Sequence, residues 1–476
     1  MSNFNTKTKV VATVGPACSD KETLKAMLLA GVDVFRINFS HGAHEDKKEI
    51  IDMIHEINAE LGTNTAILAD LSGPKIRLGN IEGDSIELEP GDEIIFTSEP
   101  VPGNADIIQI TYPGFAKDVR AGHRVMLDDG KIEMRVKKVL NDKEVLMESV
   151  YSGTVRPQKG VNLPETILSI PSITDKDMND LQFIFTQNLS WIALSFVRAA
   201  NDIIKLRGMI EFNNHPAKII AKIEKPEAVE VLDEIIAASD GIMVARGDLG
   251  VEIPVENVPL VQKRIVKACI KESKPVIIAT QMMESMMENA GPTRAEVTDV
   301  ANAIFDGADA VMLSGETAVG KHPVRVVETM QRICAQAESD EGIYNIKHTL
   351  DKQHDKFLSD AVIFNATFIA DGVDARAIVG MTKTGYTAFK LSSCRPKAKI
   401  YVFTENTILL NQLSLLWGVR AFHYAKFESN DGTIRDVVNM LRNKSLLEQG
   451  DRVISTGSMP IAERGPTNFV KLTVVD

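Results

Sequence analysis

Residues 218–247 read KIIAKIEKPEAVEVLDEIIAASDGIMVARG and decide the fold. A nearly continuous apolar run, Lys218–Glu224, precedes a helical pattern over Pro226–Ala238 and a second apolar run, Gly241–Gly247. Short apolar runs of this kind are typical of parallel strands covered by helices on both faces, and a proline suits the first turn of a helix. The segment therefore predicts a strand–helix–strand unit with parallel strands.

The same unit recurs on both sides of this segment. Further helical patterns occur at Ser19–Ala30, Asp46–Leu61, Val258–Lys271 and Arg294–Phe305, and glycines follow the first two as stop signals. Eight such repeats favour a TIM (β/α)8 barrel. The hydrophobic pattern alone does not exclude the alternative of an open sheet of six strands with two extra edge strands. The predicted strands are Val10–Gly15, Val34–Phe39, Thr65–Asp70, Trp191–Phe196, Lys218–Glu224, Gly241–Gly247, Pro275–Gln281 and Ala310–Gly315.

One long interval breaks the alternation. Between Asp70 and Pro171 helical periodicity disappears, and strand-like pieces such as DSIELEPGDEIIFTS and HRVMLDDGKIEMRVKKV alternate with Gly, Pro and Asp-Gly turns. We interpret residues 73–169 as a β-barrel lid domain inserted after the third strand, with a passive decoration as the alternative. Beyond residue 338 a helix and the strands ARAIVGMT, KIYVFTE and RVISTGS predict a C-terminal α/β domain at 339–476, which leaves 1–72 and 170–338 for the barrel.

Bulk properties exclude several classes of function. The 476 residues are too many for one core, and the net charge of −12 disfavours nucleic acid and anionic lipid as partners. Four widely spaced cysteines show no metal-ligand spacing and are typical of reduced thiols in a cytosolic protein. The N-terminal residues lack the apolar segment of a signal peptide, and no apolar run reaches membrane-spanning length. We expect a cytoplasmic protein that does not enter the membrane.

Polar residues occur at the carboxyl ends of the predicted strands. Because strand side chains alternate, Arg36, Asn38 and Ser40 share one face, here predicted to be the barrel interior, and Lys222 and Glu224 share the equivalent face. Any one of these residues alone is explained by an ion pair or a turn, but agreement among six strands predicts an active site at this rim. The other strands contribute Asp70, Arg246, Gly247, Asp248, Thr280, Gln281, Ser314 and Glu316.

The residue types indicate chemistry on a small anion. Glu224 and Asp248 are hard oxygen ligands suited to Mg²⁺ or Mn²⁺, although each could instead be bridged by a nearby lysine or arginine. Arg36 and Lys222 offer positive charge to a phosphate, and Gly247 permits close backbone approach, so that N–H groups there could bind a carboxylate. These are the parts that phosphoryl transfer requires. The sequence contains no GxxxxGK[ST] loop and no kinase HRD or DFG set, so a nucleotide must be recognised in another way.

Eight sequence blocks contain or flank these residues, namely RINFSHG, GPKIRLG, KGVNLP, KIEKPEA, DGIMVARGDLGVEIP, ATQMMESM, PTRAEVTDVANA and DAVMLSGETAVGKHP. These blocks resemble those of the pyruvate kinase family, and the resemblance runs from Thr8 to the C-terminus. It implies a barrel, a lid and a C-terminal regulatory domain, a homotetramer, and transfer of a phosphoryl group from phosphoenolpyruvate to ADP, giving pyruvate and ATP in the last step of glycolysis.

The resemblance also implies roles for individual positions. Arg36 would bind the phosphate of phosphoenolpyruvate, Lys222 would stabilise the transferring group, and Thr280 and Ser314 would relay the proton that turns enolpyruvate into pyruvate. Glu224 and Asp248 would hold Mg²⁺ or Mn²⁺. The substrate carboxylate would meet Gly247, Asp248 and Thr280, the nucleotide would meet Asn38, His41, Arg77 and Lys159, and potassium would meet Asn38, Ser40, Asp70 and the Leu71 carbonyl.

The potassium assignment carries a departure from the family pattern. Many members read DTKGPEIR where this chain has DLSGPKIR, so that Lys75 replaces a glutamate and Leu71 replaces a threonine. An ammonium group there could supply the charge of the monovalent cation. We therefore expect K⁺ not to be required.

A second region aligns with the family's sugar-phosphate effector loop. It follows a predicted strand and precedes a helix, which is a suitable place for a phosphate, although a simple capped turn explains it equally well. The segment SMPIAERGPTNF departs from the pattern expected for fructose 1,6-bisphosphate, so a sugar monophosphate, a nucleotide or no effector at all remain alternatives. The loop residues are Thr382, Lys383, Thr384, Gly385 and Thr387.

Two other functions compete with this interpretation. A metal-dependent carbon–carbon lyase acting on phosphoenolpyruvate or pyruvate would share the metal and carboxylate sites but would not need the lid residues Arg77 and Lys159. A binding protein that has lost its activity would not need Lys222. A coupled ADP-to-ATP assay separates these possibilities.

Overall fold

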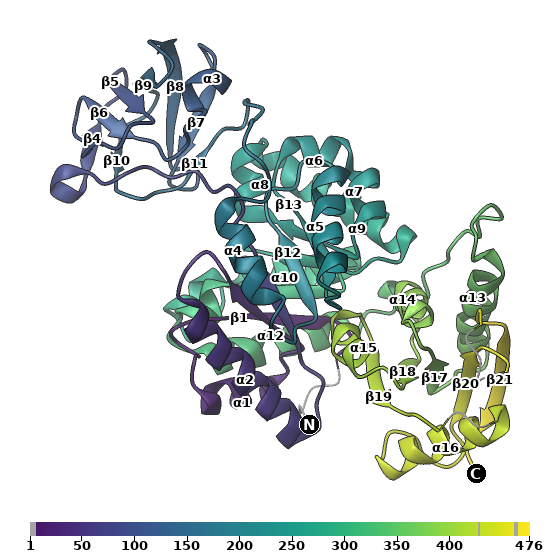
Figure 1. The fold of residues 1–476 in the computed structure, drawn as a ribbon. Coiled ribbons are helices and arrows are strands. Elements are labelled where there is room, and N and C mark those ends of the chain that lie inside the picture. The colour runs from purple at the N-terminus through teal and green to yellow at the C-terminus, as the bar shows by residue number, and fades with distance from the viewer. Residues whose placement is uncertain (1–5, 427–428, 461–464) are drawn as a thin grey trace.

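A closed barrel of eight parallel strands forms the centre of the computed structural model, which describes residues 6–426, 429–460 and 465–476 (Figure 1). Around the barrel the strands follow the order β1-β16-β15-β14-β13-β12-β3-β2. Each strand begins and ends within two residues of its predicted bounds, and the predicted TIM barrel is confirmed. The strands are β1 (Lys9–Val14), β2 (Val34–Asn38), β3 (Ala66–Asp70), β12 (Trp191–Leu194), β13 (Lys218–Ile223), β14 (Gly241–Ala245), β15 (Val276–Ala279) and β16 (Ala310–Leu313).

The barrel interior changes from apolar to polar along the strands. Val11, Val34, Leu68, Ala193 and Ile220 belong to one buried apolar cluster inside the barrel. Because side chains of a strand alternate, the residue two positions further on continues the same inward row. On these five strands that residue is polar, namely Thr13, Arg36, Asp70, Ser195 and Lys222.

Helices surround the barrel. The predicted helix Pro226–Ala238 is two helices, because the backbone at Val231 leaves the helical region (φ −106°, ψ 31°). Arg246 begins a helix directly after β14, so Gly247 and Asp248 lie in a first helical turn and not at the end of a strand. The helices are α1 (Lys21–Ala30), α2 (His44–Leu61), α4 (Asp175–Ile184), α5 (Ala200–Phe212), α6 (Pro226–Glu230), α7 (Leu232–Ala238), α8 (Arg246–Glu252), α9 (Val258–Glu272), α10 (Arg294–Asp306), α11 (Gly315–Ala318) and α12 (Pro323–Ala337).

The insertion between β3 and β12 forms the predicted lid domain, which extends from the barrel beside α8 (Figure 1). A curled sheet in the order β11-β7-β8-β9-β5-β6 and a two-stranded sheet β10-β4 enclose one apolar core. One short helix was not predicted. The elements are β4 (Ile86–Leu88), β5 (Glu93–Thr97), β6 (Ile107–Gln109), α3 (Phe115–Asp118), β7 (Arg124–Leu127), β8 (Ile132–Val139), β9 (Glu144–Ser149), β10 (Gly153–Val155) and β11 (Val161–Asn162).

The C-terminal region forms the predicted separate α/β domain, with a five-stranded sheet in the order β19-β18-β17-β20-β21. A buried ion pair between Arg395 Nη1 and Asp309 Oδ1, at 2.9 Å, ties it to the start of barrel strand β16. Within the described ranges, no helix combines the length and apolar character that a membrane crossing needs. The elements are α13 (Phe357–Gly372), β17 (Ala377–Met381), α14 (Tyr386–Ser393), β18 (Lys399–Thr404), α15 (Thr407–Gln412), β19 (Val419–His423), α16 (Asn430–Asn443), β20 (Arg452–Gly457) and β21 (Phe469–Val474).

Candidate active site

Two cations and two carboxylates meet where β2, β3 and β13 end. Asp70 Oδ2 accepts a hydrogen bond from Arg36 Nε at 2.6 Å, and Asp70 Oδ1 lies 3.3 Å from Lys222 Nζ. Lys222 Nζ also lies 3.0 Å from Glu224 Oε1 and donates to Ser195 Oγ at 2.7 Å. The side chains of Asp70 and Glu224 are each 1% exposed. The sequence prediction that Lys222 and Glu224 share a face of β13 is consistent with this contact.

Charge balance keeps the cations of this cluster ionised. Burial alone would raise the pKa of Asp70, but Lys222 and Arg36 outweigh it and hold the pKa of that carboxyl below its usual range. Burial likewise works against the Lys222 ammonium, yet Asp70 and Glu224 raise its pKa above the ordinary value. The site therefore presents a fixed ammonium and a fixed guanidinium, which suits an anionic ligand.

The proposed metal ligands form an acidic pair that a cation would stabilise. Burial, reinforced by the Asp248 carboxylate, raises the pKa of Glu224 although Lys222 opposes the shift. Both groups are hard oxygen donors, and two carboxylates plus a ligand phosphate are a usual donor set for Mg²⁺. No group of three or more His, Cys, Asp or Glu ligands occurs in the described part of the chain. The two carboxylates are the kind of hard oxygen donor that Mg²⁺ and Mn²⁺ prefer.

The alternative of lysine-bridged carboxylates is partly observed. Glu224 meets Lys222, and Asp248 Oδ1 lies 3.8 Å from Lys75 Nζ. Arg246 takes no part in either bridge, because its guanidinium pairs with Asp299 on α10. The Asp248 side chain is 24% exposed and therefore accessible to an ion from solvent.

The loop after β15 packs closely on the first turn of α8. A Cβ atom on Gly247 would lie 2.7 Å from Thr280 Cγ2, so the close approach requires glycine at this position. Thr280 itself has φ of 74°, a strained value for a β-branched residue. Arg246 Nη2 donates to the Thr280 carbonyl at 2.7 Å and so holds this loop in place. The backbone N–H groups of α8 and the Thr280 side chain thereby belong to one wall of the site.

Ser314 lies at the neighbouring strand end, after β16. Its backbone N–H donates to Glu316 Oε2 at 2.7 Å, and Glu316 Oε1 accepts from the N–H of Met283 at 3.0 Å. The buried Glu316 carboxylate therefore links the loops that follow β15 and β16. This link places Thr280 and Ser314 on adjacent parts of the rim.

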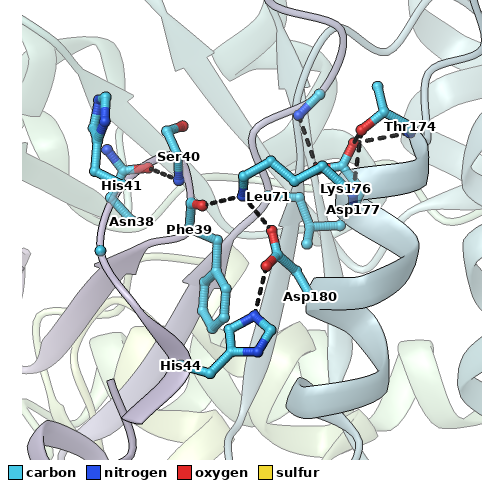
Figure 2. A network of polar contacts seen from close by, with 12 residues as sticks. Asn38, Phe39, Ser40, His41, His44, Leu71, Thr174, Lys176, Asp177 and Asp180 are labelled. Atoms are coloured by element: carbon cyan, nitrogen blue, oxygen red, sulfur yellow. Dashed lines mark hydrogen bonds and ion pairs between the residues drawn. The ribbon is translucent and has the colours of Figure 1, made fainter. Parts of the chain in front are cut away.

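The residues proposed to bind potassium gather at the ends of β2 and β3, as Figure 2 shows for Asn38, Ser40 and Leu71. Asn38 Oδ1 accepts from the Ser40 N–H at 3.0 Å, and Asn38 pairs in register with Asp70. The Leu71 carbonyl accepts from Ser195 Oγ at 2.7 Å. Asn38 Oδ1, the Leu71 carbonyl and the Asp70 carboxylate, three of the four groups that would meet a monovalent cation, thus already have partners inside the protein.

Helix α4 supports this rim, a role the sequence did not indicate (Figure 2). Lys176 Nζ donates to the Phe39 carbonyl at 2.5 Å and pairs with Asp180 Oδ2 at 2.6 Å. His44 Nε2 lies 2.7 Å from Asp180 Oδ1, and Asp177 Oδ1 accepts from the Gly73 N–H at 3.1 Å. The loop after β2 and the start of the lid are thus both attached to one helix.

The proposed nucleotide contacts come from the lid and from the loop after β2. The backbones of Arg77 and Gly160 form an antiparallel β-bridge between two lid segments. Lys159 Nζ lies 2.9 Å from Asp128 Oδ1. Burial, with the charges of Arg77, Lys75 and two further lysines, lowers the pKa of His41. Positive charges of both the lid and the barrel thus act on this imidazole, which indicates a local positive potential.

The predicted effector residues follow β17: residues 382–385 form the loop before α14, and Thr387 lies in the first turn of that helix. Gly385 has φ of 88° and its N–H donates to Thr382 Oγ1 at 2.9 Å, while Thr387 Oγ1 lies 2.9 Å from Thr467 Oγ1. Lys383 Nζ lies 3.7 Å from Glu405 Oε1, and Thr384 is exposed. Residues 461–464 of the segment SMPIAERGPTNF lie outside the described residues.

The fold and this rim define a (β/α)8-barrel protein with an inserted lid domain and a cation-rich, carboxylate-containing cluster at the strand ends. Residues 5–327 match the family model "Pyruvate kinase, barrel domain", and residues 360–473 match "Pyruvate kinase, alpha/beta domain". Curated pyruvate kinases from Bacillus licheniformis and Geobacillus stearothermophilus are 42% and 41% identical over 98% of this chain and 80% of their own length. The crystal structure of a pyruvate kinase from Cryptosporidium parvum superposes with a TM-score of 0.91 at 35% identity, covering 99% of this chain and 97% of that one. The chain belongs to the pyruvate kinase family, which confirms the family, the fold and the function predicted from sequence.

Proposed function

We propose that the cluster at the ends of β2, β3 and β13 performs the phosphoryl transfer from phosphoenolpyruvate to ADP. The observation that carries this assignment is the position of Lys222 Nζ, within 3.3 Å of oxygens of Asp70, Ser195 and Glu224. An ammonium held at this point stabilises the charge that develops on the transferring group. Arg36, fixed by Asp70, binds the phosphate of phosphoenolpyruvate.

Glu224 and Asp248 hold the divalent ion, Mg²⁺ or Mn²⁺, which supplies charge neutralisation for the phosphoryl oxygens when bound. The substrate carboxylate binds the N–H groups of Gly247 and Asp248 in the first turn of α8, together with the Thr280 hydroxyl. The tight packing of Gly247 on Thr280 supports this part of the proposal, because it brings the two donors to one wall.

The second half of the reaction needs a proton. Breaking the bond between phosphorus and the enol oxygen leaves an enolate, and a proton added to its methylene carbon gives pyruvate. Thr280 and Ser314, on loops joined through Glu316, relay this proton from solvent. Asn38, His41, Arg77 and Lys159 bind the nucleotide, a role that the cationic surroundings of His41 support.

Lys75 removes the need for K⁺ in this proposal, because its ammonium group, 3.8 Å from Asp248 Oδ1, brings a monovalent charge into the site. Without that compensation, Asn38, Ser40, Asp70 and the Leu71 carbonyl would hold K⁺.

The protein is cytoplasmic and assembles as a homotetramer in this proposal. Exposed apolar side chains on the C-terminal domain support association, since Leu358, Phe368 and Val474 are 75%, 70% and 56% exposed. The loop 382–387 binds a sugar phosphate or a nucleotide as an effector, with the exposed Thr384 as its most accessible hydroxyl.

The test is the variant Lys222→Met, assayed for ADP-dependent pyruvate formation. Loss of the ammonium is expected to lower kcat by about 10²–10³-fold, the usual effect of removing one transition-state donor. Lys218→Met, four residues earlier on the same strand, is the control and should keep near-normal turnover. Normal turnover of a folded Lys222→Met protein would contradict the assignment, and thermal unfolding of both variants verifies folding.

A further inference from the structure

A buried ion pair lies outside the reacting cluster, at the junction of the lid and the barrel. Lys225 Nζ is 2.8 Å from Glu252 Oε2, and each side chain is only 2% exposed. Lys225 Nζ also approaches the carbonyl of Leu163 at 3.4 Å, and Asn162 Nδ2 donates to Glu252 Oε1 at 2.9 Å. The ammonium and the carboxylate of this pair therefore each contact a residue of the lid, Leu163 and Asn162 respectively.

The pair is connected to both proposed metal ligands. Lys225 directly follows Glu224 in the chain, and Glu252 lies one helical turn beyond Asp248 on α8. Residues four apart on a helix lie on the same side of it. A shift of either partner would therefore be felt by the carboxylate next to it.

Helix α8 also meets the lid at a second point. Gly130, in the turn between β7 and β8, lies beside α8, and a Cβ atom there would be in ordinary contact, at 3.5 Å, with both methyl groups of Val251. The same turn carries Asp128, the partner of Lys159. The lid thus rests on α8 through this turn and through Asn162.

The segments that enter and leave the lid come together beside the ion pair. A narrow cavity of about 20 Å³ is lined by Pro74–Ile76 of the first segment, by Val161–Leu163 of the second, and by Lys225, Asp248 and Glu252. A rotation of the lid about these segments must move Asn162 and Leu163 relative to the pair. It would leave buried charges with fewer partners, which is unfavourable.

We propose that Lys225 and Glu252 are positioning residues that, through Asn162, set the orientation of the lid and couple it to the metal-binding carboxylates. The proposal rests on the roles given above to Glu224, Asp248 and the lid cations. Neither residue touches the reacting groups. The pair holds the lid so that Lys159 faces the site, and its loss lets the lid adopt a wider range of orientations.

The lid orientation can be measured without reference to activity. All four native cysteines are buried, so spin labels can be directed to Leu140→Cys on the lid and Phe212→Cys on the barrel, positions 41% and 87% exposed. Distance distributions are recorded for the otherwise unchanged full chain, for Asn162→Ala, and for the double variant Lys225→Met/Glu252→Leu, which replaces both charges at once and so leaves neither unpaired. Asn104→Ala is the matched control, because Asn104 Oδ1 accepts from the N–H groups of Asp106 and Ile107 within the lid, away from the labelled turn.

We expect a broader distance distribution in Asn162→Ala and in the double variant, and an unchanged one in Asn104→Ala. The KM for ADP should rise about tenfold in the first two. The KM for phosphoenolpyruvate should stay within about twofold in Asn162→Ala but rise in the double variant, whose substitutions adjoin both metal-binding carboxylates. A residue that served stability alone would lower the unfolding temperature without broadening the distribution. Unchanged distributions in both variants would overturn the proposal, whatever their activity. If Lys159→Ala and Arg77→Ala left the KM for ADP unchanged, the nucleotide assignment would fail instead, and the distances would still decide the role of the pair.

Discussion

Arg246 and Asp299 form a two-point ion pair in which Nη1 meets Oδ1 and Nη2 meets Oδ2, each at 2.7 Å. The arginine begins α8 and the aspartate lies on α10, so the pair connects two successive strand–helix units of the barrel. The guanidinium also donates to the Thr280 carbonyl at 2.7 Å and to the Ala279 carbonyl at 3.2 Å. One side chain thus fixes the loop that carries Thr280.

Arg246→Lys should therefore impair catalysis although it preserves the charge. A lysine ammonium cannot serve both carboxylate oxygens and the Thr280 carbonyl in this planar arrangement. We expect kcat to fall by about 10²-fold, the effect of a displacement of about 1 Å in a catalytic group. Arg207→Lys is the control, because Arg207 pairs with Asp240 near the opposite end of β14 at 3.1 Å. Equal losses in both variants would show that the effect is structural and not local to Thr280.

The barrel could be predicted because its strands are buried on both faces, which leaves short apolar runs that only parallel strands explain. Two strands of the C-terminal domain lacked that signal. In β19 the sequence VRAFH is mostly half-exposed, and β21 is an antiparallel edge strand with exposed Lys471 and Leu472. The break at Val231 was also missed, because a single residue outside the helical region leaves the apolar periodicity intact.

The site was partly predictable because side chains alternate between the two faces of a strand. Alternation along β13 gave Lys222 and Glu224, and the same rule applied at the end of β12 would have identified Ser195, the residue that accepts from Lys222. Asp299 and Lys176 could not be found in this way. They lie on helices, and nothing in the local sequence states which strand end a helix side chain will reach.

Divalent metal affinity should depend on pH through Glu224. Burial and Asp248 raise the pKa of this carboxyl in the metal-free protein, so a metal ion competes with a proton at pH values near and below that pKa. Affinity is expected to weaken as pH falls through the raised pKa, and binding should release protons there. The free energy of unfolding of the metal-free protein should change with pH in the opposite direction. A raised carboxyl pKa in the folded state stabilises the protein at low pH, and this stabilisation is lost as pH rises through that pKa.

Calorimetry of Mn²⁺ binding in buffers of different ionisation enthalpy measures this proton release. Glu224→Gln should abolish it together with most of the affinity, whereas Glu230→Gln, exposed on α6, should leave both unchanged. Binding without proton release at any pH between about 4.5 and 8 would contradict the expected competition.

His41 should take up a proton when ADP binds. Burial and the neighbouring cations lower its pKa in the free protein, and the nucleotide phosphates would oppose those charges and raise it. By linkage, ADP affinity should increase as pH falls between the bound and free pKa values. Imidazole NMR signals followed through a pH titration report both states. His41→Gln should remove the pH dependence, and His55→Gln, whose ring contacts the Asn188 carbonyl, should not. An identical His41 titration with and without ADP would argue against a phosphate near this ring.

Lys75 should make the enzyme independent of potassium. Turnover is expected to be similar in buffers that contain K⁺ and in buffers where tetramethylammonium is the sole added monovalent cation. Lys75→Glu places a second negative charge near Asp248 and removes the ammonium, so its activity without K⁺ should fall at least about tenfold and recover in part when K⁺ is added. Lys117→Glu makes the same charge change on an exposed face of the lid and should have little effect. A large loss of wild-type activity on removing K⁺ would show that the ammonium does not replace the ion.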